Sequence, residues 1–81
     1  FLKKILKDGP MASTIINAAN EELVKLFLGK EIKFTDIVKN LNMIIRLKEY
    51  NKYAKKAPKS LDDIHRVDKW ARLKTNVISV R

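Results

Sequence analysis

The stretch "INAANEELVKLFLG", Ile16 to Gly29, begins with residues that disfavour a helix and ends as a regular amphipathic one. Asn17 and Asn20 are weak helix formers, because their short amides compete for nearby backbone groups. From Met11 to Leu28, however, apolar residues recur at helical spacing within a sector of roughly 120°, at ~100° per residue. They are Ala12, Ile15, Ile16, Ala19, Leu23, Leu26 and Phe27. This pattern predicts a long amphipathic helix that the glycine ends.

A shorter apolar segment precedes this helix. Residues 1–7 place Leu2, Ile5 and Leu6 on one side and end before Gly9-Pro10, a helix-stop signal. The segment is too short for a stable isolated helix, so we interpret it as the tail of a longer helix. The chain also begins without a methionine. Together these features predict a domain cut from a longer protein.

A connector and a third helical pattern follow the glycine. Ile32 and Phe34 alternate in the connector, and we expect them to pack it onto the core. Thr35 is a candidate N-cap. Residues 36–56 read as one helix that ends before Pro58, because the residue before a proline avoids helical geometry. The residues in register along this helix are Ile37, Leu41, Ile44, Ile45 and Lys48.

The last helical pattern opens at "SLDD", residues 60–63. Ser60 as N-cap and Asp63 three residues later form a capping-box pattern, and Asp62 suits the positive end of the helix dipole. A broad apolar face follows, made of Ile64, Val67, Trp70, Ala71, Leu73, Val77 and Ile78. No strand pattern, glycine-rich loop or internal repeat occurs in the sequence. We therefore predict an all-α fold, a small helical bundle of three full helices plus a truncated first helix.

Composition narrows the class of protein. The 81 residues make one domain, with the 46% hydrophobic content of a globular chain. The absence of cysteine excludes disulfides and thiolate metal sites. No apolar run within these residues exceeds three, too short for a membrane span or a signal-peptide core. The net charge of +9 suggests nucleic acid or a membrane surface as a partner. Most of the basic residues are lysine rather than arginine, however, so we interpret them as solvated surface.

Few residues in the chain suggest catalysis or metal binding. His65, the single histidine, lies three residues after Asp62 and three before Asp68, so one D-x-x-H pair occurs. A carboxylate-bridged metal site in a helical bundle needs that motif on two helices, with further glutamates. The sequence also lacks a P-loop, a dinucleotide-binding fingerprint and a set of Ser, His and Asp. We therefore predict no catalytic, cofactor-binding or metal-binding residues in this chain.

The segment from residue 46 to residue 59 concentrates positive charge. It holds six basic residues against Glu49, a local charge of +5, and Tyr50 and Tyr53 interleave with them. Basic residues with aromatics can bind single strands, although a solvated helix end explains the same residues. A helix-turn-helix fits poorly, because the connector after Gly29 is longer than usual and Asp36 would face phosphates. A free-standing basic module that binds nucleic acid or another acidic partner stays open as the alternative.

Two blocks of the sequence resemble one enzyme family. "STIINAANEELVKLFLGKEIKFTDI", residues 13–37, resembles the signature of the carboxy-terminal helical domain of the 1-deoxy-D-xylulose 5-phosphate reductoisomerases. The matching residues are Ile16 to Glu21, Phe27-Leu28, Gly29, Ile32, Phe34 and Asp36-Ile37. "SLDDIHRVDKWAR" resembles the family's last helix through Asp68, Trp70, Ala71 and Arg72. The sequence departs from the pattern at Ile16, where leucine is usual, and residues 42–59 show no resemblance.

This resemblance implies the function of a longer parent protein. Family members rearrange and reduce 1-deoxy-D-xylulose 5-phosphate to 2-C-methyl-D-erythritol 4-phosphate in the non-mevalonate route to isoprenoids. They use NADPH and a divalent cation, Mg or Mn. An amino-terminal dinucleotide-binding domain and a central catalytic domain precede the helical one, and the parent is a cytoplasmic homodimer. The resemblance thus implies that residues 1–81 are a non-catalytic domain whose partners are the other domains of the same chain.

The same blocks contain candidate docking residues. At ~100° per residue, Asn17 and Asn20 share one flank of their helix with Val24 and Leu28. We expect the two amides to hydrogen-bond backbone groups of a neighbouring segment, which would set how the bundle docks; the alternative is that both are solvated. Glu21, Asp68 and Arg72, from the two resembling blocks, complete the set of residues expected to act in docking or in structure.

Overall fold

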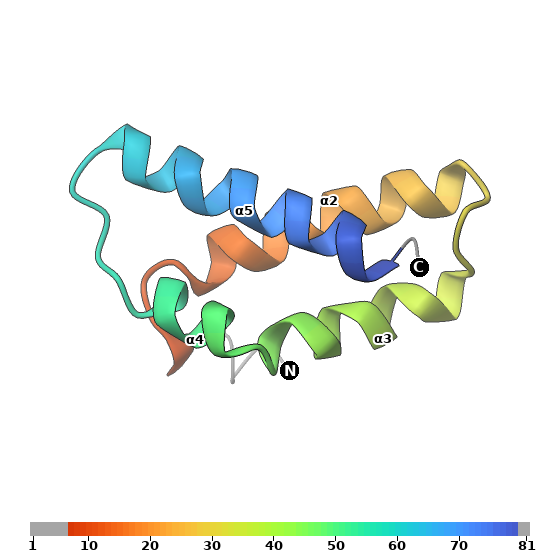
Figure 1. The fold of residues 1–81 in the computed structure, drawn as a ribbon, viewed down its shortest axis with the longest axis horizontal. Helices are drawn as coiled ribbons and strands as arrows, with labels where there is room; N and C mark the ends of the chain where they lie inside the picture. The colour runs from red at the N-terminus through yellow and green to blue at the C-terminus, as the bar shows by residue number, and fades with distance from the viewer. Residues whose placement is uncertain (1–6, 80–81) are drawn as a thin grey trace.

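The chain folds into helices alone over residues 7–79, the part that the computed structural model describes (Figure 1). Helix α2 spans Ala12–Leu28, α3 Phe34–Ile45, α4 Lys48–Ala54 and α5 Leu61–Ser79. The predicted all-α bundle is therefore confirmed. The expected first helix lies outside the described residues except at its end, where Lys7 is helical.

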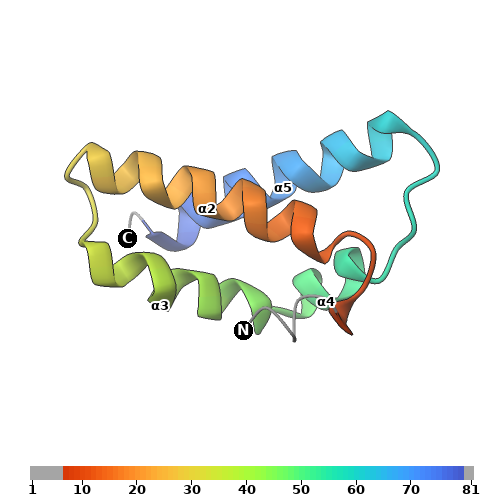
Figure 2. The ribbon, with the colours of Figure 1, turned by 180° about the vertical axis from the view of Figure 1, so that it is seen from behind.

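Helix α2 is the central element of the bundle. It packs most extensively on α5 and runs beside α3 in the opposite direction (Figures 1 and 2). The apolar stripe predicted for it is confirmed, with every member buried or packed against the core. Ala18 is buried as well, beside Ala19, and α5 contributes Ala71 to the same cluster. These small side chains allow the backbones of two helices to come close.

The turn before α2 depends on a glycine. Gly9 has φ +137°, and a Cβ built on it would lie 2.2 Å from the carbonyl oxygen of Ala54. The Met11 N–H donates to that same oxygen over 3.0 Å. The chain thus crosses the end of α4 at a distance that only glycine permits. This contact sets where α2 begins.

The single helix predicted for residues 36–56 is wrong. The structure has α3 and α4 there, separated at Arg46-Leu47, and Leu47 adopts the extended backbone of an N-cap. An uninterrupted helix would place Tyr50 about 140° away from the middle of the α3 core stripe. The break turns Tyr50 and Ala54 inward, and both are fully buried. No glycine or proline marks the break, so the sequence pattern did not reveal it.

The start of α3 also differs from the prediction. Thr35 is not the cap, because the helix already begins at Phe34. The N-cap is Lys33, two residues before Thr35, and its N–H donates to the Asp36 carboxylate over 2.9 Å. Ile32 packs against the core as expected. Phe34 contacts the ring of Phe27 yet stays 70% exposed.

The apolar face predicted for α5 is too broad. Val67, Ala71 and Thr75 are buried, whereas Leu73 and Val77 are exposed. These two lie on a flank that no described helix covers. At the start of α5, Ser60 Oγ accepts from the Asp63 N–H as predicted. The Asp63 carboxylate, however, accepts from the Lys59 N–H rather than from Ser60, so the capping box is displaced by one residue.

Candidate functional site

One cluster of charged side chains joins α5 to α2. The Nε of Arg72 donates to the Asp68 carboxylate over 3.0 Å, and its Nη2 donates to the Glu21 carboxylate. The Nη1 of Arg72 lies 3.8 Å from Oε2 of Glu22. The hydrogen bond to Glu21 and then that to Asp68 raise the pKa of the Arg72 guanidinium. Three of the five expected docking or structural residues, Glu21, Asp68 and Arg72, thus lie together within the domain.

Two further members of this cluster were missed by the sequence reasoning. Asn76 Nδ2 donates to Glu22 over 2.8 Å and to the Arg72 carbonyl over 3.0 Å. The Glu22 side chain is only 14% exposed, so these contacts provide hydrogen-bond partners for a largely buried carboxylate. Residues four apart share a helix face, so Arg72 and Asn76 were a recognisable pair. Their acidic partners on α2 become evident only when the two helices are docked.

Asn17 and Asn20 lie apart from this cluster. Both are exposed, on the α2 flank that also carries Val24 and Leu28. Neither amide makes a hydrogen bond to another residue within 7–79. No described helix of the bundle therefore supplies the backbone partners that we expect for these two side chains. Their docking role stays a prediction about a partner beyond this domain.

A second polar junction links α4 to α5. Glu49 accepts from Lys74 over 3.2 Å and from Trp70 Nε1 over 3.3 Å. These contacts, led by Lys74, lower the pKa of the Glu49 carboxyl. The rings of Tyr53 and Trp70 lie 4.9 Å apart beside it. The junction holds α4 in the turned position that the break at residues 46–47 creates.

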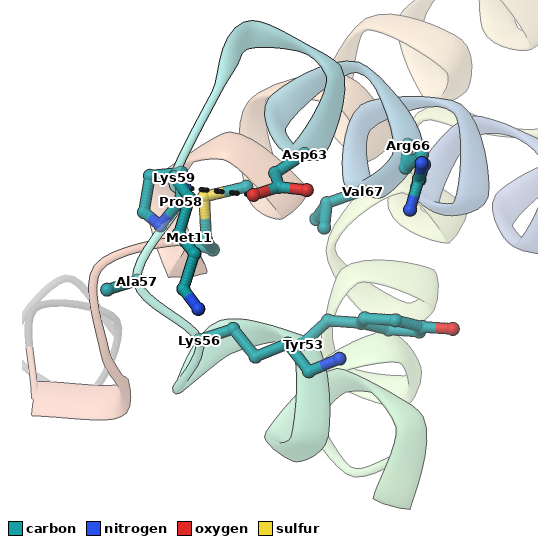
Figure 3. Close-up of a pocket in the computed structure, with 9 residues that line it drawn as sticks. All are labelled: Met11, Tyr53, Lys56, Ala57, Pro58, Lys59, Asp63, Arg66 and Val67. Carbon is teal, nitrogen blue, oxygen red and sulfur yellow. Dashed lines mark hydrogen bonds between the residues drawn. The ribbon is translucent and has the colours of Figure 1, made fainter.

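A basic groove lies where α4, the linker and α5 meet (Figure 3). Lys56, Lys59 and Arg66 line it, over an apolar floor that includes Met11 and Val67. The remaining lining residues are Tyr53, Ala57, Pro58 and Asp63. This groove contains no pairing of a nucleophile with a base, and its one carboxylate already caps α5.

The basic segment does not form an aromatic platform. Tyr50 is fully buried, and its hydroxyl donates to the Asp8 carboxylate over 2.7 Å. Only Tyr53 is left near the surface, with the ammonium groups of Lys52 and Lys56 at 6.0 Å and 5.8 Å from its ring. Bases stack on successive exposed rings. This arrangement therefore offers at most one stacking surface.

The residues present do not fit a metal ion or a dinucleotide. His65 is exposed, and its neighbour Asp68 is engaged by Arg72. Over residues 7–79, no three or more His, Cys, Asp and Glu side chains are grouped as ligands would be. The sequence also offers no glycine-rich loop for a pyrophosphate. Within the same range, no helix has the length and apolar content to span a bilayer.

The fold and its polar clusters define a class: a small helical module whose charged side chains join helix to helix. The comparisons with known proteins give the family. The chain belongs to the DXP reductoisomerase C-terminal domain family, whose model matches residues 1–74. The resemblance seen in the sequence is thereby confirmed.

Curated relatives carry the same family name. A 1-deoxy-D-xylulose 5-phosphate reductoisomerase of Pelagibacter ubique is 37% identical over 80 residues, which are 99% of this chain and 21% of that protein. The enzyme of Proteus mirabilis is 41% identical over 70 residues, 86% of this chain and 16% of that protein. The present chain therefore spans about a fifth or less of the length of these relatives. No solved structure gives a significant match.

Proposed function

We propose that these 81 residues serve as the non-catalytic, supporting domain of a longer 1-deoxy-D-xylulose 5-phosphate reductoisomerase. In this proposal an amino-terminal dinucleotide-binding domain and a central catalytic domain precede them in the same polypeptide. The observation that carries the proposal is that the model of the C-terminal domain family matches residues 1–74. The relatives that align with this chain are about four to six times as long. The internal ion cluster of Arg72 supports it, since that cluster serves to join α5 to α2.

The chemistry of the parent belongs to the rest of that polypeptide. The parent would convert 1-deoxy-D-xylulose 5-phosphate to 2-C-methyl-D-erythritol 4-phosphate in the cytoplasm, as a homodimer. NADPH would supply the hydride, and a divalent cation, Mg or Mn, would assist the reaction. Among residues 7–79, no group of His, Cys, Asp and Glu side chains could hold the metal ion. The contribution of this domain would be to stabilise the domains that hold NADPH and the cation.

Turnover by the full-length polypeptide tests this proposal. With Mg or Mn, we expect it to oxidise NADPH only when 1-deoxy-D-xylulose 5-phosphate is present, measured by the loss of nicotinamide absorbance. The 81 residues alone should neither turn over substrate nor bind NADPH in calorimetry. Micromolar NADPH binding by the isolated chain would contradict the supporting role. A full-length polypeptide without turnover, together with tight binding of an acidic partner, would favour the free-standing basic module.

A further inference from the structure

One face of the bundle carries apolar and amide side chains without charge. On α2 it consists of Asn17, Asn20, Val24 and Leu28, and on α3 of Phe34 and Val38; we call it the α2–α3 face. All six are exposed, Leu28 and Phe34 by 73% and 70%. Single exposed apolar side chains are common on monomeric domains, but apolar side chains gathered on one face are typical of interaction sites.

The two flanks lie on the same side of the bundle. Phe27 of α2 and Phe34 of α3 meet edge to face at 5.6 Å, which places the α3-facing side of α2 next to this face. Helix α5 contacts the opposite side of α2 through Glu22, which accepts from Asn76, while Glu21, at the edge of this face, reaches across to Arg72. Figure 2, where α2 crosses in front of α5, views the bundle from the side away from α5.

The lack of charge distinguishes this face from the rest of the surface. A third of the chain is Asp, Glu, Lys or Arg. Next to this face, Ser13 and Thr35 are exposed and uncharged, and the charged Glu21 at its edge is paired with Arg72 of α5. The other exposed apolar pair, Leu73 and Val77, shares its flank of α5 with Arg66 and Lys69. Charged residues are depleted at the centre of protein interfaces, because their desolvation is costly. The α2–α3 face has the composition of such a centre, and the α5 flank does not.

The net charge argues against a second copy of this chain as the occupant. Two copies would each bring a charge of +9, and their repulsion would oppose a symmetric contact. Relatives, by contrast, carry about four-fifths of their length outside the matching region. We propose that the α2–α3 face docks onto an apolar surface of the remaining domains of the same polypeptide, with Asn17 and Asn20 hydrogen-bonding backbone groups there. This inference rests on the proposed function and names the surface that it requires.

Thiol labelling of the full-length polypeptide tests this docking. The chain has no cysteine, and Val38 on the face and Leu73 on the α5 flank are both 59% exposed, so they form a matched pair. Val38→Cys and Leu73→Cys variants are treated with N-ethylmaleimide under native conditions, and labelling of the relevant peptide is followed by mass spectrometry. We expect the thiol at position 38 to react at least ten-fold more slowly than that at position 73. In urea the two rates should be equal.

Equal native rates would overturn the inference, because the face would then be open to solvent. Protection at position 73 alone would also overturn it, while the supporting role would stand with a different docking side. Should either variant fail to fold, Leu28→Cys and Val77→Cys give a second pair. Turnover is measured separately, so a protected but inactive polypeptide would contradict the proposed function and not this surface.

A photo-crosslinker identifies the occupant. A benzophenone maleimide on the cysteine at position 38 is irradiated in the full-length protein. A crosslink to a peptide outside these 81 residues, at the mass of one polypeptide, supports docking within the chain. A product at twice that mass, joined through this face, would mean that a second copy covers it and would overturn the inference.

Discussion

At the scale of single residues, buried polar side chains decide how the helices meet. Tyr50 is fully buried, and its hydroxyl donates to Asp8, 42 positions earlier in the sequence. The amide of Asn40 on α3 is buried as well and donates to the hydroxyl of Ser79 at the end of α5. A buried donor that loses its partner costs more than the bond contributes. Such pairs therefore select one packing among several that the apolar residues alone would allow.

Tyr50→Phe tests the first of these pairs. Removing the hydroxyl should lower the free energy of unfolding by about 1–3 kcal/mol at pH 8, because the Asp8 carboxylate loses a donor. Burial and then Asp8 raise the pKa of Tyr50 above its usual value, so the native state holds this proton more tightly than the unfolded state. The stabilisation is thus complete below pH ~10 and is lost as the pH rises further.

Urea denaturation at pH 8 and at pH 11 measures this effect. The difference between the parent and Tyr50→Phe should shrink at the higher pH, and the comparison cancels the titration of the lysines. A difference that is constant over this range would argue against the Tyr50 proton as its source.

The substitution Asn20→Ala should affect the stability of the isolated domain and of the full-length polypeptide differently. In the isolated 81 residues the change should be neutral or stabilising by up to ~0.6 kcal/mol, since Asn20 is exposed there and alanine is the better helix former. In the full-length polypeptide it should cost about 1–3 kcal/mol, because backbone groups at the docked surface lose a partner. Asn51→Ala, another exposed asparagine in a helix, is the control. Equal denaturation midpoints for the two full-length variants would leave the docking role of Asn20 without support.

At the scale of elements, turns and helix ends set the boundaries. Helix α2 ends at Leu28, but Lys30 rather than Gly29 adopts the left-handed backbone, with φ 62°. The N–H groups of Lys30 and Glu31 reach back to Phe27 and Leu26, which closes the helix. The two glycines of the chain therefore differ in kind: Gly9 is required by a close approach, whereas Gly29 is not.

Gly9→Ala and Gly29→Ala make this difference measurable. The first should destabilise the domain by about 2–4 kcal/mol, since the new Cβ meets the Ala54 carbonyl at a positive φ. The second should change stability by less than ~1 kcal/mol, because its nearest contact would be an ordinary 3.5 Å. Thermal melting of both variants checks the contrast. A Gly9→Ala domain that melts with the parent would mean that α4 yields at this point.

At the scale of the whole molecule, charge is distributed unevenly. The excess of positive charge lies on α4, the linker and the basic groove, whereas the α2–α3 face is uncharged. Such a molecule attracts polyanions through lysine point charges and counterion release, without reading their sequence. Its specific contact is expected at the other, uncharged surface.

Nucleic-acid binding tests this division. We expect the chain to bind duplexes and single strands weakly, without sequence preference, and to release them as salt rises. The reason is structural, since burial of Tyr50 leaves Tyr53 as the one ring of the basic segment near the surface. Fluorescence anisotropy with labelled oligonucleotides provides the measurement. Sub-micromolar affinity at physiological salt would favour the basic-module alternative.

The sequence by itself determined the helical class, the core stripe of α2 and the family. These features depend on local periodicity, on helix-stop signals and on two blocks of residues that are contiguous along the chain. The expectation that Glu21, Asp68 and Arg72 act in docking or structure came from the same blocks. Helical periodicity and helix-stop signals depend on residues within about one turn of each other, so they can be recognised in the sequence alone.

Only the tertiary structure decided the break between α3 and α4, the narrower core face of α5 and the ion cluster around Arg72. Helix α3 ends at Ile45 without a glycine or proline, because the free energy gained by burying Tyr50 outweighs the helical hydrogen bonds lost at the break. Leu73 and Val77 stay exposed because no described helix lies over their flank. Glu22 and Asn76 meet across 54 positions of sequence. Contacts between distant residues depend on how whole helices dock, and no local pattern in the sequence records that arrangement.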